Sequence, residues 1–244
     1  PPGFPLWMAF VGGVAGMGKS KLAWGGLGQN LFNPAIVGRA FLQAAFPTAI
    51  TTWTAPAAAG SWFTIPAGQL ALPLLRADVD VVSAATPLGL MKFEHVGTDK
   101  LQLFLGDTTG SAGETFAVLL ILCGVWLGVR RLYDWRLPVS TLLAAAAFSG
   151  VLYLVDPAVY PDPLFTLLSG GLLFGAVFMV TDPVTTPTTP RGAWIFGIGV
   201  GLLTVLIRVF GGLPEGVMYA ILLMNAMSPH IEQATQPKPF GARS

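Results

Sequence analysis

Long runs of apolar residues separated by short polar segments dominate this chain. A helix needs about 20 apolar residues to cross the ~30 Å hydrocarbon core of a bilayer. No stretch shows the roughly ten-residue alternation of apolar and polar positions that a transmembrane barrel strand requires. The pattern therefore predicts an all-α, polytopic transmembrane helix bundle. About seven spans are expected, at residues 4–18, 34–55, 112–129, 137–155, 164–181, 192–210 and 214–230.

The composition is far more apolar than that of a soluble protein. Of the 244 residues, 53% are hydrophobic and 10% are charged, and the mean hydropathy is +0.68. Soluble domains carry about 25% charged residues, so we expect an integral membrane protein. The prediction is one membrane domain over 1–244, with an outer loop at 56–110, a five-helix part at 111–231 and a tail at 232–244. The net charge of +1 and the lack of a basic stripe give no reason to expect a nucleic-acid partner.

Basic residues in the loops predict the orientation of the spans. Arg130, Arg131 and Arg136 share one loop, which the positive-inside rule places in the cytoplasm. Alternation then puts the loops at 56–110 and 156–163 outside and the C-terminal tail inside. The N-terminus would lie outside, so an odd number of spans is expected upstream of it. The chain is accordingly interpreted as truncated at its N-terminus.

Residues 13–20 match the phosphate-loop pattern G-x-x-x-x-G-K-[ST]. That pattern requires a preceding strand and a soluble α/β domain, whereas here it follows an expected span. We therefore expect no nucleotide hydrolysis, and we interpret Lys19 and Lys21 as interface anchors. Metal ligands are scarce as well. Cys123 is the single cysteine, and His95 and His230 have no neighbours at ligand spacing, so no metal site is expected.

A polar segment in the long loop reads Asp80-Val81-Val82-Ser83-Ala84-Ala85-Thr86, the pattern Asp-x-x-Ser-x-Ala-Thr. It resembles the acceptor site of flavin transferases, which esterify the phosphate of FMN onto the final threonine. On this interpretation Thr86 carries the flavin, and Asp80, Ser83 and Ala85 form the recognition segment. The small neighbours leave room for a second enzyme's active site. The same residues equally fit a turn that caps a helix.

Two segments on the cytoplasmic side are typical of interrupted helices. Asn30 and Asn33 follow a glycine-rich stretch, and Pro34 suits the first turn of a helix. Thr181-Asp182-Pro183 ends a later glycine-rich run and could be its counterpart in an inverted repeat. Broken or re-entrant helices at these points would form a small-molecule or ion site. The alternative is an ordinary cytoplasmic loop.

Charged residues inside or beside the expected spans are candidates for function, because burying them in a membrane is costly. Glu114 opens the span at 112–129, and Arg39 lies in the second span. Glu114 and Asp182 are therefore candidates for an ion pathway. Glu114 equally suits the first turn of a helix, where the helix dipole favours an acid. Arg208 near the outer end of a span is expected to pair with Glu215 across the following turn.

Several of these blocks together resemble the NqrB/RnfD family, and within it the RnfD membrane component of the Rnf complex. That complex, also called Rsx, is an ion-translocating ferredoxin:NAD oxidoreductase, and NqrB is the homologous component of the sodium-pumping NADH:quinone reductase. The resemblance covers essentially the whole chain. The blocks that carry it are Gly25-Gly26-Leu27-Gly28-Gln29-Asn30, Phe32-Asn33-Pro34-Ala35, Gly38-Arg39-Ala40-Phe41, Ser83-Ala84-Ala85-Thr86-Pro87-Leu88, Gly110-Ser111-Ala112-Gly113-Glu114-Thr115, Thr181-Asp182-Pro183 and Leu203 through Val217.

The resemblance implies a redox role in a bacterial or archaeal plasma membrane. Thr86 would hold FMN by a phosphoester bond, and Asn30 and Asn33 match positions that line a riboflavin site in the quinone-reductase relative. The expected partners are the other components of the complex, a flavin transferase, and Na⁺ or H⁺ as the translocated ion. The chain would relay electrons without being catalytic alone. Two alternatives stay open: the NqrB component of a sodium-pumping NADH:quinone reductase, and a passive solute channel of related architecture.

Overall fold

The computed structural model describes residues 1–26, 28–53, 69–73 and 85–237. Within these ranges every regular element is helical, so the predicted all-α class is confirmed there. Asp80 and Ser83 lie outside the described residues. The elements are α1 (Leu6–Ser20), η1 (Leu22–Trp24), α2 (Pro34–Ala45), α3 (Pro47–Thr51), α4 (Pro87–Gly89), η2 (Leu90–Glu94), α5 (Lys100–Leu105), α6 (Ala117–Val129), α7 (Arg136–Val155), α8 (Pro163–Leu168), α9 (Leu172–Phe174), η3 (Gly175–Met179), α10 (Pro190–Phe210) and α11 (Val217–Thr235).

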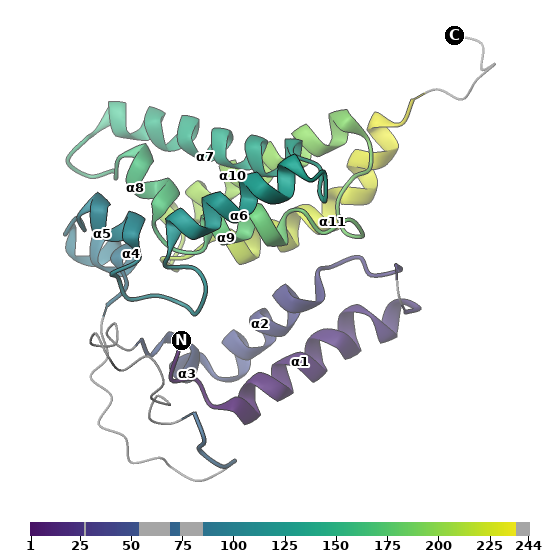
Figure 1. The fold of residues 1–244 in the computed structure, drawn as a ribbon, viewed down its shortest axis with the longest axis horizontal. Coiled ribbons are helices and arrows are strands. Elements are labelled where there is room, and N and C mark those ends of the chain that lie inside the picture. Colours follow the sequence, from purple (N-terminus) through teal and green to yellow (C-terminus); the bar gives the residue numbers. More distant parts are fainter. Residues whose placement is uncertain (27, 54–68, 74–84, 238–244) are drawn as a thin grey trace.

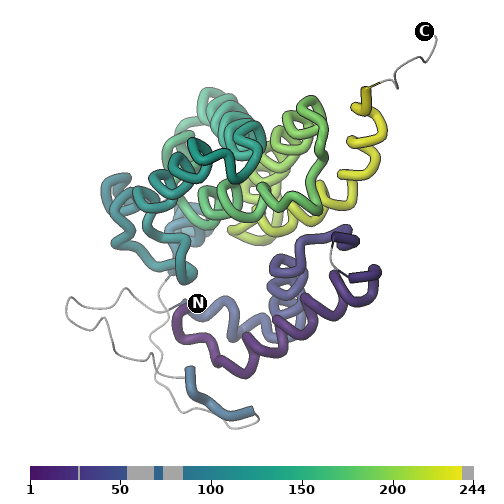
Figure 2. The backbone as a smooth tube through the Cα atoms, turned by 45° about the vertical axis from the view of Figure 1, so that its right-hand side comes forward, coloured from purple at the N-terminus to yellow at the C-terminus, as the bar shows by residue number. Residues whose placement is uncertain are grey.

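The helices form a bundle with a separate helical hairpin beside it. Helix α10 packs between α7 and α11, and α6 and the α8–η3 segment complete the bundle. Helices α1 and α2 run antiparallel as a hairpin, below the bundle in Figure 1 and again apart from it in Figure 2. Helix α2 touches α11, so the hairpin meets the bundle along that helix.

Small residues let α7 and α10 approach closely. A Cβ added to Gly197 would overlap Ser140 Oγ, and one added to Gly201 would lie 2.9 Å from the Cβ of Ala144. Such small-residue stripes let helix backbones come together without the hydrophobic drive that water supplies. The glycines spaced along α10 therefore determine which face of this helix meets α7.

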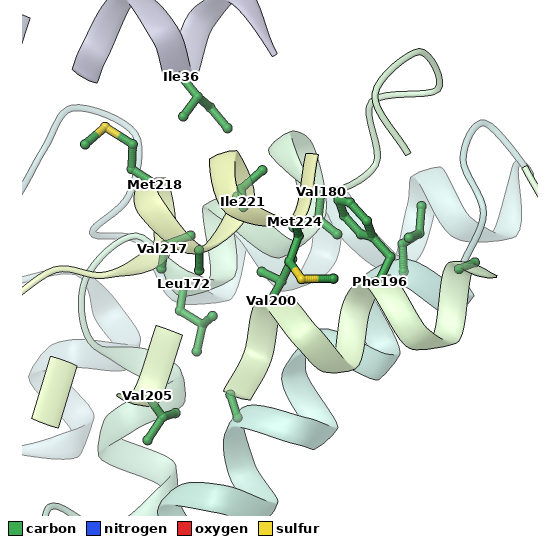
Figure 3. Packing of buried hydrophobic residues seen from close by; sticks show 14 of the residues in the cluster. Ile36, Leu172, Val180, Phe196, Val200, Val205, Val217, Met218, Ile221 and Met224 are labelled. Carbon is green, nitrogen blue, oxygen red and sulfur yellow. The ribbon is translucent and has the colours of Figure 1, made fainter. Parts of the chain in front are cut away.

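The main hydrophobic core lies where α10 and α11 meet. Phe196 and Val200 of α10 and Ile221 of α11 are fully buried. Figure 3 shows these side chains around Met224, with Ile36 of α2 reaching toward α11. This contact joins the α1–α2 hairpin to the bundle through apolar packing.

Helix α1 contains the whole phosphate-loop pattern. Residues 13–20 lie inside one continuous helix, so their backbone N–H groups are committed to the helix ladder and do not form a phosphate cradle. A Cβ at Gly16 would overlap the Pro34 carbonyl, so a glycine at this position allows α1 to pack closely against α2. Lys19 stacks over the Phe41 ring at 5.4 Å from its centroid. The expectation that the pattern is not a nucleotide site agrees with this geometry.

Two of the described helices, α7 and α10, are long and apolar enough to cross a membrane. Helix α6 is apolar but shorter. Large apolar side chains face outward on these elements, including Val129 at 77% and Leu154 at 82% exposed. The remaining expected spans coincide with helices that are shorter, broken or less apolar.

The segments around 164–181 and 85–106 differ from the simple sequence pattern. The expected span at 164–181 is broken into α8, α9 and η3, because Gly170 adopts φ +62° in the left-handed region that favours glycine. The second half of the expected outer loop contains α4, η2 and α5. Helix α5 begins where Asp99 accepts a hydrogen bond from the Leu101 N–H, and it ends at Gly106 with φ +82°.

Candidate functional site

Thr86 is the residue before the short helix α4, and its side chain caps that helix. Its Oγ1 accepts a hydrogen bond from the Gly89 N–H at 3.2 Å, and Pro87 occupies the first helical position. The turn-capping alternative is therefore realised in the structure. It does not compete with the flavin interpretation, because the hydroxyl uses an acceptor lone pair here and keeps its proton. Thr86 is half-buried and Ala85 is exposed.

Lys92 fixes the segment that follows Thr86 to the end of α10. Its Nζ donates to the carbonyls of Arg208 at 2.7 Å, Leu213 at 2.9 Å and Gly211. A cation placed on the last carbonyls of a helix also interacts favourably with the helix dipole. Burial lowers the pKa of Lys92. The sequence gives Lys92 no partner, since nothing in its spacing pairs it with a carbonyl more than a hundred residues away.

Lys100 attaches α5 to the start of α8. It forms an ion pair with Asp162, whose other oxygen accepts a hydrogen bond from the Phe165 N–H at 2.6 Å and caps α8. The hydrogen bond to Asp162, together with the charge of that carboxylate, raises the pKa of Lys100. The two loops that sequence analysis placed outside, at 56–110 and 156–163, therefore meet at one end of the bundle.

The break between α8 and α9 is held by charged groups from the end of α10 and the turn after it. Arg208 is 6% exposed and donates to the carbonyls of Thr166 at 2.7 Å and Ser169 at 3.1 Å, at the C-terminal end of α8. Glu215 accepts the Gly171 N–H at 2.7 Å, at the N-terminal side of α9. Each charge thus complements the helix dipole it faces. The backbone groups that the helix break leaves free at Thr166, Ser169 and Gly171 therefore have partners.

The expected pairing of Arg208 with Glu215 is wrong. Glu215 forms its ion pair with Arg39 of α2, with 3.2 Å between Nη2 and Oε2. Both terminal nitrogens of Arg208 are occupied by the carbonyls of the broken helix. Its guanidinium and the Glu215 carboxylate instead flank Gly170, where an added Cβ would lie 3.2 Å from the first and 3.3 Å from the second. The sequence marks Arg39 as a charge in an expected span but does not indicate that Glu215 is its partner.

Glu114 lies in the turn before α6 rather than inside a helix, because α6 begins only at Ala117. Its side chain folds back so that Oε1 accepts the Ser111 N–H at 2.8 Å. Glu114 is 8% exposed, and the ion pairs of the described residues do not include it. A Cβ at Gly171 would lie 2.9 Å from its Oε2 and 2.8 Å from Glu215 Oε1. The two carboxylates therefore converge on the glycine at the helix break.

Thr86 shares a cavity with these charges. The cavity, here called the threonine cavity, has a volume of about 90 Å³ and is lined by Thr86, Arg39, Glu114 and Glu215 among others. Thr108, Thr109 and Trp53 also line it. Of the predicted site residues, Thr86 and Glu114 are thus brought together, although they come from different expected elements.

Asn30, Asn33 and Asp182 lie at the opposite end of the helices. Asn33 and Asp182 line one cavity, and Asn30 lines a second one beside Thr185 and Thr186. Asn33 caps α2 by accepting the Ala35 N–H at 3.0 Å. Asp182 accepts from the Val184 N–H at 3.2 Å and from the Thr185 hydroxyl at 3.1 Å. Both predicted breaks therefore face the same end of the molecule, far apart in sequence but adjacent in space.

Comparison with known proteins identifies the family. The model of the NQR2, RnfD, RnfE family matches residues 1–241. This chain belongs to that family. It is 40% identical to the D component of the proton-translocating ferredoxin:NAD(+) oxidoreductase complex of Clostridium ljungdahlii, over 100% of this chain and 71% of that protein. It is 37% identical to the D component of the Na(+)-translocating ferredoxin:NAD(+) oxidoreductase complex of Acetobacterium woodii, over 99% of this chain and 69% of that protein.

A third relative has a broader name. The D component of the ion-translocating oxidoreductase complex of Stutzerimonas stutzeri is 39% identical, over 99% of this chain and 72% of that protein. The two ferredoxin-type relatives are nearly equally similar to this chain, yet one name specifies protons and the other Na⁺. Membership in the family is therefore shown, while similarity alone does not select the coupling ion.

Proposed function

We propose that this chain is the membrane component that carries covalently bound FMN on Thr86 in an ion-translocating ferredoxin:NAD⁺ oxidoreductase complex. The family match over residues 1–241 and the names of the relatives support the type of complex. One structural observation supports the flavin assignment: Thr86, the last residue of the flavin-acceptor pattern, lines a cavity. Bound flavin would supply one-electron and two-electron exchange to the relay.

The Thr86 side chain is partly accessible to a modifying enzyme, because it is half-buried and the residue before it, Ala85, is exposed. Lys92 holds the following helical segment to α10, so the attachment point is fixed relative to the bundle. Ester formation requires the hydroxyl proton to leave, and the capping bond uses the oxygen only as an acceptor. Asp80, Ser83 and Ala85 would serve recognition by the flavin transferase.

Seven membrane spans, with Thr86 on the outer face and the C-terminus in the cytoplasm, complete the proposal. The loops assigned outside meet each other through Lys100 with Asp162 and through Lys92 with the turn at Gly211. The segments assigned inside meet at the other end, where Asn30, Thr186 and Glu232 line one cavity. This grouping supports the alternation that the positive-inside rule predicts. The plasma membrane is the proposed location, with the other components of the complex as partners.

Glu114 and Asp182 are the proposed ion-handling carboxylates, for Na⁺ or H⁺. Glu114 has the stronger case, because it is buried, close to Glu215 and on the same cavity as Thr86. Asp182 is committed to a capping turn but lines a cavity with Asn33. Riboflavin beside Asn30 and Asn33 is a further part of the proposal. Asn30 is 5% exposed, and its Oδ1 has no partner among the described residues, so it offers an acceptor there.

The decisive experiment is mass measurement of the chain produced in cells that supply a flavin transferase. The intact protein and the peptide that contains Thr86 should both gain the mass of esterified FMN, and the gel band should fluoresce under ultraviolet light. Thr86→Ala should lose both signals. Thr109→Ala, which changes another threonine of the same cavity, should keep them. Unmodified Thr86 under these conditions would overturn the flavin assignment.

A further inference from the structure

Helices α7 and α10 begin at the same end of the bundle. A Cβ added to Gly197 would overlap the carbonyl of Leu137, and one added to Gly201 would overlap the carbonyl of Thr141. One turn along α10 therefore matches one turn along α7 in the same direction, so the two helices run parallel. The positive-inside rule places the end at which they begin in the cytoplasm.

Basic side chains gather at this end of the bundle. Arg191 lies in the first turn of α10, and Trp194 of the same helix packs edge-on against Trp135, with 6.1 Å between the ring centroids. That contact holds the start of α10 beside the turn between α6 and α7. The arginines of these two segments are here called the arginine face, and they are Arg130, Arg131, Arg136 and Arg191.

Most of the positive charge on the arginine face has no carboxylate beside it. Arg136 forms an ion pair with Asp134, with 3.2 Å between Nη1 and Oδ2. Glu232, at the same end of the bundle, accepts a hydrogen bond from the Thr188 N–H at 2.7 Å. The other three arginines are exposed, and they take part in none of the ion pairs that the described residues form. The face therefore presents an excess of positive charge to an anion.

Contacts to α6 fix the turn that carries two of these arginines. Tyr133 donates a hydrogen bond from its hydroxyl to the Gly124 carbonyl at 2.5 Å. Arg131 has φ +54°, in the left-handed region that residues other than glycine seldom adopt, and such strain persists only where the surroundings impose it. Arg130 lies over the Trp126 ring, 5.7 Å from its centroid. Contact with a ring still leaves a guanidinium N–H donors that match two oxygens of a phosphate.

The surroundings of the arginine face favour a lipid over a soluble acidic protein. Trp126 and Trp135 are 59% and 53% exposed, and Val129 and Leu132 are exposed beside the arginines. Exposed apolar side chains continue along α6 as far as Leu122. Tryptophan rings are typical of the headgroup level of a membrane, and the cytoplasmic leaflet carries anionic lipids that attract basic segments. A soluble protein would match the charge but would leave the apolar surface without a partner.

We infer that the arginine face binds the headgroup of an anionic phospholipid of the cytoplasmic leaflet. Arg130 and Arg131 would donate hydrogen bonds to the phosphate, and Arg191 would add positive charge from the neighbouring helix. The acyl chains would lie along the exposed apolar side of α6. Such binding goes beyond the proposed function, because it does not require FMN on Thr86.

The test measures lipid binding to the full-length protein, purified in detergent and stripped of lipid. Phosphatidylglycerol or phosphatidylcholine is titrated in, and bound lipid is counted by native mass spectrometry. We expect the parent protein to prefer phosphatidylglycerol. Arg130→Gln combined with Arg131→Gln should weaken that binding about 30-fold, from the usual contribution of two basic residues at an anionic surface. Lys19→Gln combined with Lys21→Gln is the matched control, because Lys19 also lies over an aromatic ring, and it should bind as the parent does.

The parent protein provides a second measurement that needs no substitution. Raising the salt concentration should weaken phosphatidylglycerol binding, because the arginines are exposed and their charge is screened. Equal binding of the two lipids, binding that does not respond to salt, or full binding after the arginine changes would overturn the lipid site. Unchanged lipid binding with loss of another component of the complex would show an acidic protein as the partner instead. Unmodified Thr86 would overturn the proposed function and leave these measurements unaffected.

Discussion

Glu215 bridges two parts of the structure, and the two contributions can be separated by substitution. Its Oε2 accepts from Arg39 of α2 at 3.2 Å, and its Oε1 accepts the Gly171 N–H at 2.7 Å. Glu215→Gln keeps an oxygen for Gly171 and removes only the charge. The ion pair is partly exposed, at 29% for Arg39 and 21% for Glu215, so its loss should cost about 0.2–1 kcal/mol. Relief of repulsion from Glu114 offsets part of that cost.

Glu215→Ala should destabilise the protein clearly more than Glu215→Gln, because it also leaves the Gly171 N–H without an acceptor at the helix break. An orphaned buried donor costs about 1–3 kcal/mol in addition. For a chain of this size about 1 kcal/mol corresponds to about 2–4 °C in Tm. Thermal unfolding in detergent at one fixed scan rate gives the comparison, since membrane proteins often unfold irreversibly. Glu94→Ala, at an exposed position of η2, is the control.

A double-variant comparison then tests the ion pair itself. Arg39→Gln combined with Glu215→Gln should be no less stable than the worse single variant, because the pair is already lost in each. Equal shifts in Tm for Glu215→Gln and Glu215→Ala would refute the reasoning. They would mean that the hydrogen bond to Gly171 contributes nothing to holding α9 in place.

Two further predictions concern charges at the two ends of the helices. The pairing with Asp162 raises the pKa of Lys100 in the folded protein. The stability that this pair contributes should therefore be complete below the ordinary lysine pKa of 10.5 and should be lost as pH rises through the raised pKa of the folded state. If the Tm of Lys100→Met falls with alkaline pH in the same way as that of the parent protein, this prediction is contradicted. In the complex reconstituted into vesicles, Glu114→Gln should abolish redox-driven ion uptake and Asp182→Asn should reduce it, each measured beside electron transfer. Ion flux that survives both changes together would remove these carboxylates from the pathway.

Sequence patterns predicted the helical class and the places where helices occur, because apolar run length and capping residues act locally. Asn33 with Pro34 begins α2 as its pattern indicates, and Thr86 with Pro87 begins α4 in the same way. The apolar pattern did not predict the backbone conformation at places where residues distant in sequence determine it. The break at Gly170 depends on Arg208 and Glu215, which lie about forty residues away along the chain.

The site was predictable only in part for the same reason. Thr86 could be proposed from the sequence because a modifying enzyme must read a short linear segment. Glu114 could be proposed because a carboxylate in an apolar run is conspicuous. The partner of Glu215 was assigned to Arg208 because that residue is near in sequence, whereas packing of α2 against the bundle supplies Arg39. The contacts of Lys92 could not be predicted, because its acceptors are backbone carbonyls, which leave no trace in a sequence.

The charged groups around the break between α8 and α9 offer a physical link between the electron transfer and the ion movement proposed for this chain. Arg208 binds the last carbonyls of α8 and lines a cavity between α7, α8 and α10. On the other side of Gly170 and Gly171 lie Glu215 and Glu114. Arg208 and Arg39 bring two positive charges to this helix break, and Glu215 and Glu114 bring two negative charges, so the charges balance. A negative charge added near Arg208 would disturb that balance, and in a low-dielectric interior the disturbance would reach the carboxylates with little screening. A cation or proton taken up at the carboxylates would restore it, which links electron transfer to ion movement without a long chain of intermediates.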